Sequence, residues 1–245
     1  MNFTFRYAAS ALCVGFLLAA CTPSPPAPTP AQQKAQADAD RAARNLDTYR
    51  QLLRIHSDDM AVTMGKDIVQ RFPDSAAAKE VQQTLPAIEK RYHEASEKAR
   101  LAGLWLYQVS PMAGGTQSTA TIYSSESSGA DRVRLVLRRH SSWGQSVFLY
   151  SSGHGFVCHR TCRLAATVDG KALRIKASAP PGGEPALLFD DDKAFVSLLK
   201  KATKITIDVT LQDGEKKEAL VYEVGGFDSA KWLPVSKKSG ASKKH

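Results

Sequence analysis

The chain has few cysteines, few aromatic residues and no apolar run long enough to cross a membrane as a helix. Of its 245 residues, 4 are Cys, 16 are Gly and 12 are Pro, and 8% are aromatic. These amounts exclude disulfide-dense, collagen-like and largely disordered classes. The apolar stretch over residues 7–20 is too short to span about 30 Å of hydrocarbon. With 43% hydrophobic and 23% charged residues, the composition is that of a globular chain with one large domain or two small ones.

The chain also lacks a strongly basic folded region, although its net charge is +9. One positive charge belongs to Arg6, and four belong to a C-terminal cluster that consists of Lys237, Lys238, Lys243 and Lys244. The parts expected to fold are close to neutral. Because a nucleic-acid-binding domain carries a basic stripe on a folded face, we expect no nucleic-acid partner.

The first residues follow the pattern of a secretory signal. Arg6 supplies the positive charge, and the apolar stretch over residues 7–20 follows it. The stretch ends in Leu18, Ala19, Ala20 and Cys21. These four residues resemble the lipobox of bacterial lipoproteins, which is an aliphatic residue, two small residues and an obligatory cysteine. The alternative is an ordinary cleaved signal followed by an unrelated cysteine.

The lipobox resemblance implies a removed signal peptide over residues 1–20 and lipidation of Cys21, with diacylglycerol on its thiol and further acyl chains such as palmitate. Each buried CH₂ contributes about 0.8 kcal/mol, so several chains anchor a protein durably. Thr22 stands where inner-membrane lipoproteins carry Asp, which implies the periplasm-facing side of the outer membrane. Residues 21–34 are proline-rich and are expected to form an extended tether.

Residues 35–101 have a helical period. Apolar residues recur at every third or fourth position, which predicts either one helix or two antiparallel helices with Ser57 capping the second. They are Leu46, Tyr49, Leu53, His56, Met60, Met64, Ile68 and Phe72. Asp74 or Ser75 is expected to cap a further helix, in which Pro86 produces a kink or a new turn.

Residues 57–100 resemble one unit of tetratricopeptide-like envelope lipoproteins, with the turn between helices at Arg71–Ala78. A second copy at a period of about 34 residues is not visible in the sequence. A single helical pair cannot bury its apolar stripe alone, so it must pack on the C-terminal region or on another protein. The segment is therefore either a structural arm or a surface that docks an envelope protein.

Residues 102–235 have the period of β-strands. Lys204–Leu211 alternates throughout, and Arg132–Arg138 alternates apolar with basic residues except at Val136. Asp169-Gly170 and Asp213-Gly214 each predict a hairpin. Eight or nine short strands are expected; the others lie near Leu104 and over 119–123, 147–150, 156–158, 164–168, 173–177 and 220–224. The predicted class is α+β, with an N-terminal helical arm or hairpin followed by an antiparallel β-sandwich or barrel.

The remaining cysteines, Cys158 and Cys162, are four positions apart between two expected strands. In an oxidising compartment they predict a disulfide that shapes a tight turn. The alternative is a zinc site completed by His154 and His159. The spacing does not fit a C-x-x-C-H haem attachment, nor the C-x-x-C of a redox-active pair.

Catalytic motifs are largely missing. Ser197–Lys200 matches S-x-x-K, but the S-D-N and K-T-G elements that accompany it in penicillin-binding enzymes are absent. Asp190–Asp192 lacks the spacing of a calcium loop and precedes an expected helix over 191–201, which suits a capped helix start. We therefore expect no enzymatic activity, no catalytic residues, no metal and no cofactor. The alternative is a cell-wall hydrolase that uses a histidine base, drawn from His140, His154 and His159.

Three segments together, Leu135–Arg139, the cysteine pair and Val224–Asp228, resemble part of an uncharacterised bacterial lipoprotein domain, which implies no activity. Residues 236–245 are expected to be a disordered basic tail. The sequence predicts a membrane-anchored periplasmic lipoprotein that binds or organises another envelope component. Accessory proteins of secretion machines and periplasmic inhibitors have this character.

Overall fold

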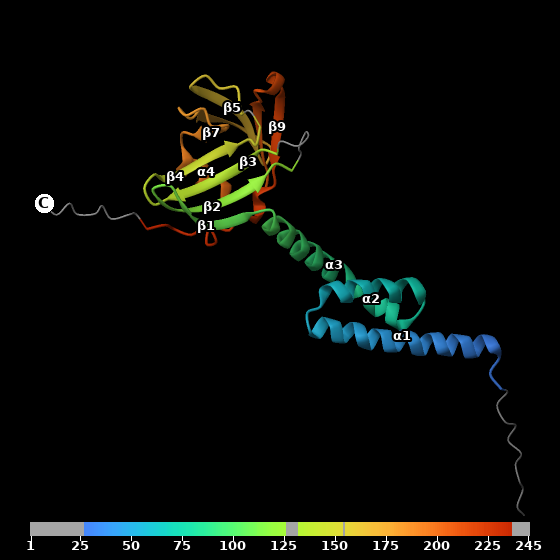
Figure 1. The fold of residues 1–245 in the computed structure, drawn as a ribbon. Helices are drawn as coiled ribbons and strands as arrows, with labels where there is room; N and C mark the ends of the chain where they lie inside the picture. Colours follow the sequence, from blue (N-terminus) through green and yellow to red (C-terminus); the bar gives the residue numbers. More distant parts are fainter. Residues whose placement is uncertain (1–26, 126–131, 154, 237–245) are drawn as a thin grey trace, which may run out of the picture. The chain divides into compact units, whose positions relative to one another are not determined.

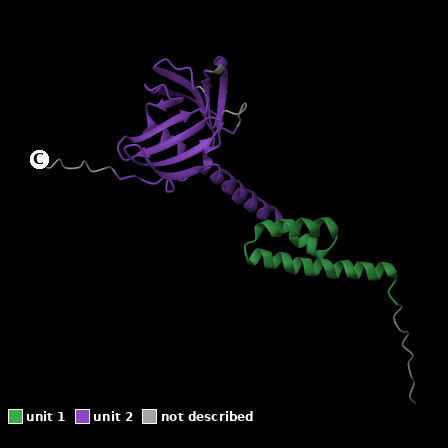
Figure 2. Cartoon of the chain, in the orientation of Figure 1, with its two compact units in different colours: residues 1–83 green, residues 84–245 purple. Residues whose placement is uncertain are grey.

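The computed structural model describes residues 27–125, 132–153 and 155–236 and divides into two compact units, residues 1–83 and 84–245 (Figure 2). Within the described residues, no helix is long and apolar enough to cross a membrane. The expected signal peptide, the lipobox with Cys21, the start of the tether, His154 and the lysine-rich tail from residue 237 lie outside them.

Unit 1 is built from α1 (Pro30–Arg54), α2 (Asp58–Arg71) and the first residues of α3 (Ala76–Gly103). The helix α1 begins at Pro30, whereas the tether was expected to continue to residue 34. A capping box explains the earlier start. Gln32 N–H donates to the Thr29 hydroxyl, and Thr29 N–H donates to the Gln32 side chain. Proline at the first helical position needs no N–H partner there.

The apolar stripe of residues 46–72 belongs to two helices, as one of the two alternatives predicted. They are separated by a turn in which His56 has a φ of 55° and Ser57 precedes α2. The two helices lie side by side (Figure 1). Their buried residues include Ala42, Leu46, Tyr49, Ala61, Val62 and Ile68.

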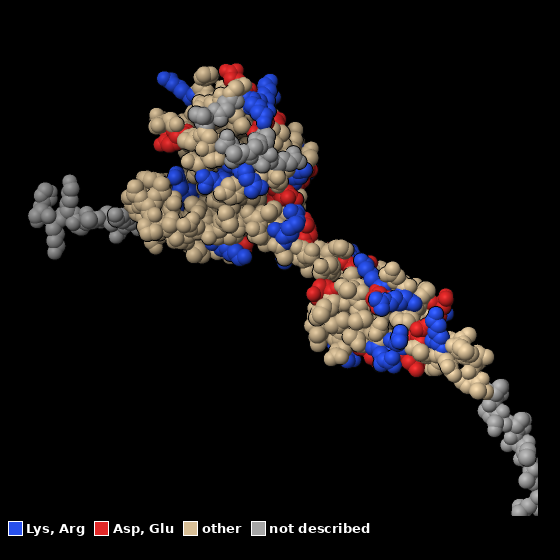
Figure 3. All heavy atoms as spheres, turned by 45° about the vertical axis from the view of Figure 1, so that its right-hand side comes forward, with Lys and Arg blue, Asp and Glu red and all other residues tan. Residues whose placement is uncertain are grey.

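The start of α3 is capped by Ser75, whose hydroxyl accepts a hydrogen bond from Ala78 N at 3.0 Å. The helix continues through Pro86 to Gly103, so no separate helix begins at the proline. Within unit 1, Arg50 on α1 makes two hydrogen bonds to Glu80 on α3, at 2.8 and 2.6 Å. Basic and acidic side chains lie intermixed on the surface of this unit (Figure 3).

Unit 2 contains one antiparallel sheet of nine strands in the order β1-β2-β3-β4-β7-β6-β5-β8-β9 (Figure 1). The α+β class and the antiparallel sheet are confirmed. The strands are β1 (Leu106–Met112), β2 (Gly115–Tyr123), β3 (Arg134–His140), β4 (Gly144–Tyr150), β5 (Thr161–Val168), β6 (Lys171–Ser178), β7 (Ala186–Phe189), β8 (Ile205–Thr210) and β9 (Lys217–Tyr222). Strands β2 to β9 contribute buried residues to one core cluster, and the partly buried Tyr107 of the edge strand β1 packs against it, so the sheet curves around a single core.

The Asp169-Gly170 hairpin is confirmed between β5 and β6, with φ values of 47° and 81° at its two turn residues. Strands β8 and β9 also pair, through a connection that contains a short 3-10 turn at Asp213–Glu215. Residues 156–158 do not form a strand, because only Phe156 makes a bridge, to Leu211. The strand β7 was not expected, since it has four residues and its outward residues, Ala186 and Leu188, are apolar.

The core is closed at one side by α4 (Asp192–Leu199) and by the C-terminal segment. The Asp191 carboxylate accepts from Ala194 N at 2.9 Å, which confirms the acidic run as a helix start. Phe195 and Leu199 turn inward from this helix. Trp232 is fully buried, and its indole N–H donates to Ser118 O at 3.2 Å.

Candidate functional site: a groove on the outer face of the sheet

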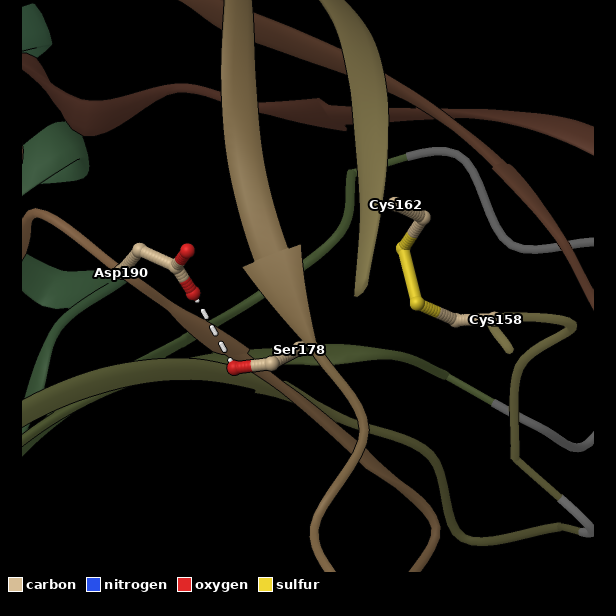
Figure 4. The surroundings of a disulfide bond; sticks show 4 residues. All are labelled: Cys158, Cys162, Ser178 and Asp190. Carbon is tan, nitrogen blue, oxygen red and sulfur yellow. Dashed lines mark hydrogen bonds between the residues drawn. A yellow bond between two sulfur atoms is a disulfide. The ribbon is translucent and has the colours of Figure 1, made fainter. Parts of the chain in front are cut away.

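Cys158 and Cys162 have their sulfur atoms at disulfide distance, with Cα atoms 5.6 Å apart (Figure 4). Cys162 lies in β5, and the carbonyl of Arg160, inside the loop, accepts from Ala179 N at 2.9 Å. The pair therefore shapes a turn at the edge of the core. Ser178 and Asp190 lie nearby and are joined by a 3.0 Å hydrogen bond.

Of the three histidines proposed as catalytic bases, the structure describes His140 and His159 but not His154. His159 is exposed on the cysteine loop. His140 is 2% exposed, and its Nδ1 accepts from the backbone N–H groups of Ser142 and Trp143, while its Nε2 has no hydrogen-bond partner within the described residues. Among the residues with described positions, neither histidine forms a hydrogen bond with a Ser, Asp or Glu side chain. In the same residues no group of three or more potential metal ligands occurs.

A groove of about 630 Å³ lies on the outer face of β1–β4 and β7. The strand register arranges its lining side chains in rows that run across the strands. The central row is apolar apart from one hydroxyl, and each residue in it stands opposite the next: Thr121, Val136, Phe148 and Leu188. Val136 is only 8% exposed although it points outward. The floor of the groove is therefore largely apolar.

Arg134 lies on one side of the central row. The register places it directly between Tyr123 on β2 and Tyr150 on β4. Its guanidinium carbon is 4.6 Å from the Tyr150 ring centroid and 5.9 Å from that of Tyr123. Cation–π attraction and the two rings thus hold this side chain along the sheet surface.

Arg138 lies on the other side of the row, four residues further along β3. Its guanidinium carbon is 5.1 Å from the Phe148 centroid and 5.3 Å from that of Trp143, and its Nε donates to the Ser146 hydroxyl at 3.2 Å. Burial lowers the pKa of Arg138 from its ordinary value, because the surrounding protein replaces part of its hydration. The guanidinium remains charged.

Trp143 forms the rim of the groove and is 53% exposed. Its ring stacks on His140 at 3.8 Å between centroids, with an interplanar angle of 16°. The two backbone hydrogen bonds to His140 Nδ1 fix the same turn. The structure thus gives His140 a positioning role beneath the tryptophan.

The charges of the groove are not balanced. Among the described residues, no carboxylate forms an ion pair with Arg134 or Arg138, and the acidic residue in the lining is Glu184, exposed on the loop between β6 and β7. Apart from the bond between Arg138 Nε and Ser146, neither guanidinium makes a hydrogen bond within the described residues, so their terminal N–H groups can bind a carboxylate or phosphate. Lys and Arg side chains cross the visible face of unit 2 in Figure 3.

The sequence contained part of this signal. The alternation over 132–138 correctly places arginines on the outer face of a strand. Val136 is apolar where the alternation would have a basic residue. Its side chain still points outward, as the strand period requires, and it stands at the centre of that face. The aromatic partners Tyr123, Trp143 and Tyr150 were missed, because only the pairing of β2, β3 and β4 brings them beside the arginines.

Comparisons with known proteins add little. No family model and no curated protein matches the chain. A solved structure, that of invasion associated protein B from Bartonella henselae, is 16% identical and covers 52% of this chain and 88% of its own. Its TM-score is 0.35, a likeness too low to support an inference about fold or function.

Proposed function

We propose that this protein is a lipid-anchored, non-enzymatic binding protein of the cell envelope, which holds an envelope component in the groove of β1–β4 and β7. The observation that carries the proposal is the pair Arg134 and Arg138. Both are partly buried on an apolar face, both are held by aromatic rings, and neither is paired with a carboxylate of the described chain. Charges in such a setting are stabilised by an anionic partner.

The anchoring part of the proposal is supported by the lipobox resemblance of residues 18–21. Because α1 begins at Pro30, only residues 22–29 separate Cys21 from the first helix. At about 3 Å per residue, such a linker reaches at most about 25 Å. An acylated Cys21 would therefore keep unit 1 close to the membrane surface.

The helical unit adds a second contact surface for the same component. At the turn between α1 and α2, Ile55 is 62% exposed and Met60 is 51% exposed. Two large apolar side chains at one exposed turn suit a protein contact. This surface is smaller and less specific than the groove, so the groove is the proposed recognition site.

Two measurements test the proposal. Replacing Cys21 by Ser should remove acylation and move the protein from the membrane to the soluble fraction; unchanged fractionation with an unmodified N-terminus would contradict the anchor. Binding is tested by purifying the acylated protein from its own membranes in mild detergent. A component that copurifies with the wild type should be lost from the Arg134→Gln/Arg138→Gln double variant and retained by Arg174→Gln on β6. Identical copurification in all three would contradict the groove as binding site.

A further inference from the structure

We infer that the ligand of the groove is an anionic saccharide that carries two acidic groups, phosphate or carboxylate, one held by Arg134 and the other by Arg138. The inference rests on the proposed function of the groove and adds the chemical class of its ligand. Its observations are the positions of the two arginines on β3, the largely apolar row that contains Val136, and the polar side chains that flank the row.

The spacing comes from the strand. Arg134 and Arg138 point to the same face of β3 and are four residues apart. At about 3.3 Å per residue, their Cα atoms are about 13 Å apart. The two guanidiniums lie over Tyr150 and Phe148, which are two residues apart on the same face of β4, so they form two neighbouring but separate positions for acidic groups. A disaccharide with an acidic group at each end can occupy both.

The apolar residues beside the two arginines favour a ligand whose middle section is uncharged. Val136 stands midway on β3, with Phe148 opposite it on β4 and Leu188 beyond on β7. The guanidinium of Arg138 lies over Phe148, whereas a ligand charge placed over Val136 or Leu188 would lose its water to an apolar surface. The apolar faces of sugar rings can lie there without that cost.

Hydroxyl and amide side chains flank the row on the β1–β2 side. Thr119 stands opposite Arg138 and Gln108, and Gln117 also lines the groove. These groups both donate and accept hydrogen bonds, which matches the hydroxyls of a sugar. Sugar rings are thus recognised at their edges here, while the arginines recognise the acids.

A peptide fits this surface less well. Extended peptides gain affinity by adding a strand to a free sheet edge. The groove lies on a face, where the ladders β1–β2, β2–β3 and β3–β4 already use the backbone groups. Single-stranded nucleic acid needs open aromatic faces for its bases, whereas Tyr123, Tyr150 and Phe148 each have an arginine over the ring.

The test is calorimetric titration of residues 21–245 carrying Cys21→Ser. The probes are a glucosamine disaccharide with phosphate at both ends, the same disaccharide with one phosphate and with none, and a short oligogalacturonate as the carboxylate source. We expect the doubly phosphorylated probe or the oligogalacturonate to bind at least about tenfold more tightly than the singly phosphorylated disaccharide, and the neutral one to bind most weakly. The tighter of the two diacid probes identifies phosphate or carboxylate as the source.

Variants locate the binding. Arg134→Gln and Arg138→Gln should each abolish the preference for two acidic groups, and Arg138→Lys should lose it in part, because lysine keeps the charge but not the planar fork. Arg174→Gln, an exposed arginine on β6, is the matched control and should change nothing. Thermal unfolding of each variant confirms that it is folded. If a glutamine variant does not fold, the comparison of Arg138→Lys with the wild type still tests the inference.

The inference is overturned if neither diacid saccharide binds, if one acidic group suffices, or if penta-glutamate or an oligo-dT binds as tightly as the best saccharide. It is also overturned if the glutamine variants bind like the wild type. Groove-dependent copurification from membranes without this saccharide preference would leave the proposed function standing and remove only the ligand class. If neither groove-dependent copurification nor the saccharide preference is observed, the proposed function is contradicted as well.

Discussion

Arg139 stacks on Trp232, with its guanidinium carbon 3.7 Å from the ring centroid, and donates to the carbonyl of the same residue at 2.6 Å. Arg139 follows Arg138 on β3 but lies on the opposite face, beside the core. Burial lowers its pKa from the ordinary value. Neighbouring arginines of one strand thus have separate roles, since one faces the groove and the other ties the C-terminal segment to the sheet.

Trp232→Ala should destabilise unit 2 by about 3–5 kcal/mol, because it removes a fully buried aromatic side chain and leaves a cavity. Urea unfolding followed by circular dichroism measures the change. Trp143→Ala is the matched control: this tryptophan is half exposed, so its loss should cost about 1 kcal/mol or less. Equal losses in the two variants would contradict the assignment of Trp232 to the core.

Gly226→Ala should destabilise the junction between α3 and the β-rich core. A Cβ at this position would collide with the backbone carbonyl of Leu101, and backbone cannot move aside cheaply. Overpacking of this kind costs about 1–3 kcal/mol. Gly103→Ala, where a Cβ meets nothing within 4 Å, should be close to neutral in the same unfolding assay. A neutral Gly226→Ala would show that the close approach does not exist in solution.

The double variant Cys158→Ser/Cys162→Ser should lower the free energy of unfolding by about 2 kcal/mol, because the cross-link closes a very short loop. Its saccharide preference should be unchanged, since neither cysteine lines the groove. The intact mass of the wild type, measured by mass spectrometry before and after reduction, shows whether the disulfide between Cys158 and Cys162 is present. Stoichiometric zinc bound to the purified wild type, with both thiols free, would contradict the disulfide.

The carboxylate of Asp169 should make the stability of unit 2 sensitive to acid. This carboxylate accepts from the Thr203 hydroxyl at 2.5 Å and from Thr203 N and Lys204 N at 3.1 and 2.8 Å, which lowers its pKa below the ordinary value. A group with a lowered folded pKa contributes stability above its unfolded pKa of about 3.9, and this is lost as the pH falls through the folded value.

Asp169→Asn should therefore be less stable than the wild type near neutral pH, and the difference should shrink between about pH 5 and pH 2. Asparagine tolerates the positive φ of this turn position, so the turn itself is retained. Urea midpoints across the pH range measure the effect. A constant difference at every pH would contradict the contribution of the charge.

The local elements of this fold were largely predictable from sequence, since their signals are local. The stripe from Leu46 to Phe72 and the Asp169-Gly170 turn both appear where the spacing places them. The groove was not predictable, because it depends on which strands pair. Chain order does not reveal that β4 pairs with β7 or that β5 lies between β6 and β8. The register places Arg134 between two tyrosines that are distant from it in sequence.

The most direct measurement is photo-crosslinking in the membranes of the producing cells, with a diazirine amino acid at position 143 on the groove rim or at position 174 on β6. We predict a defined adduct on the acylated protein from position 143, absent from position 174, and lost when Arg138→Gln is added. The same adducts from both positions, or an adduct from position 143 that persists in Arg138→Gln, would contradict the groove as the site where this protein holds its envelope ligand.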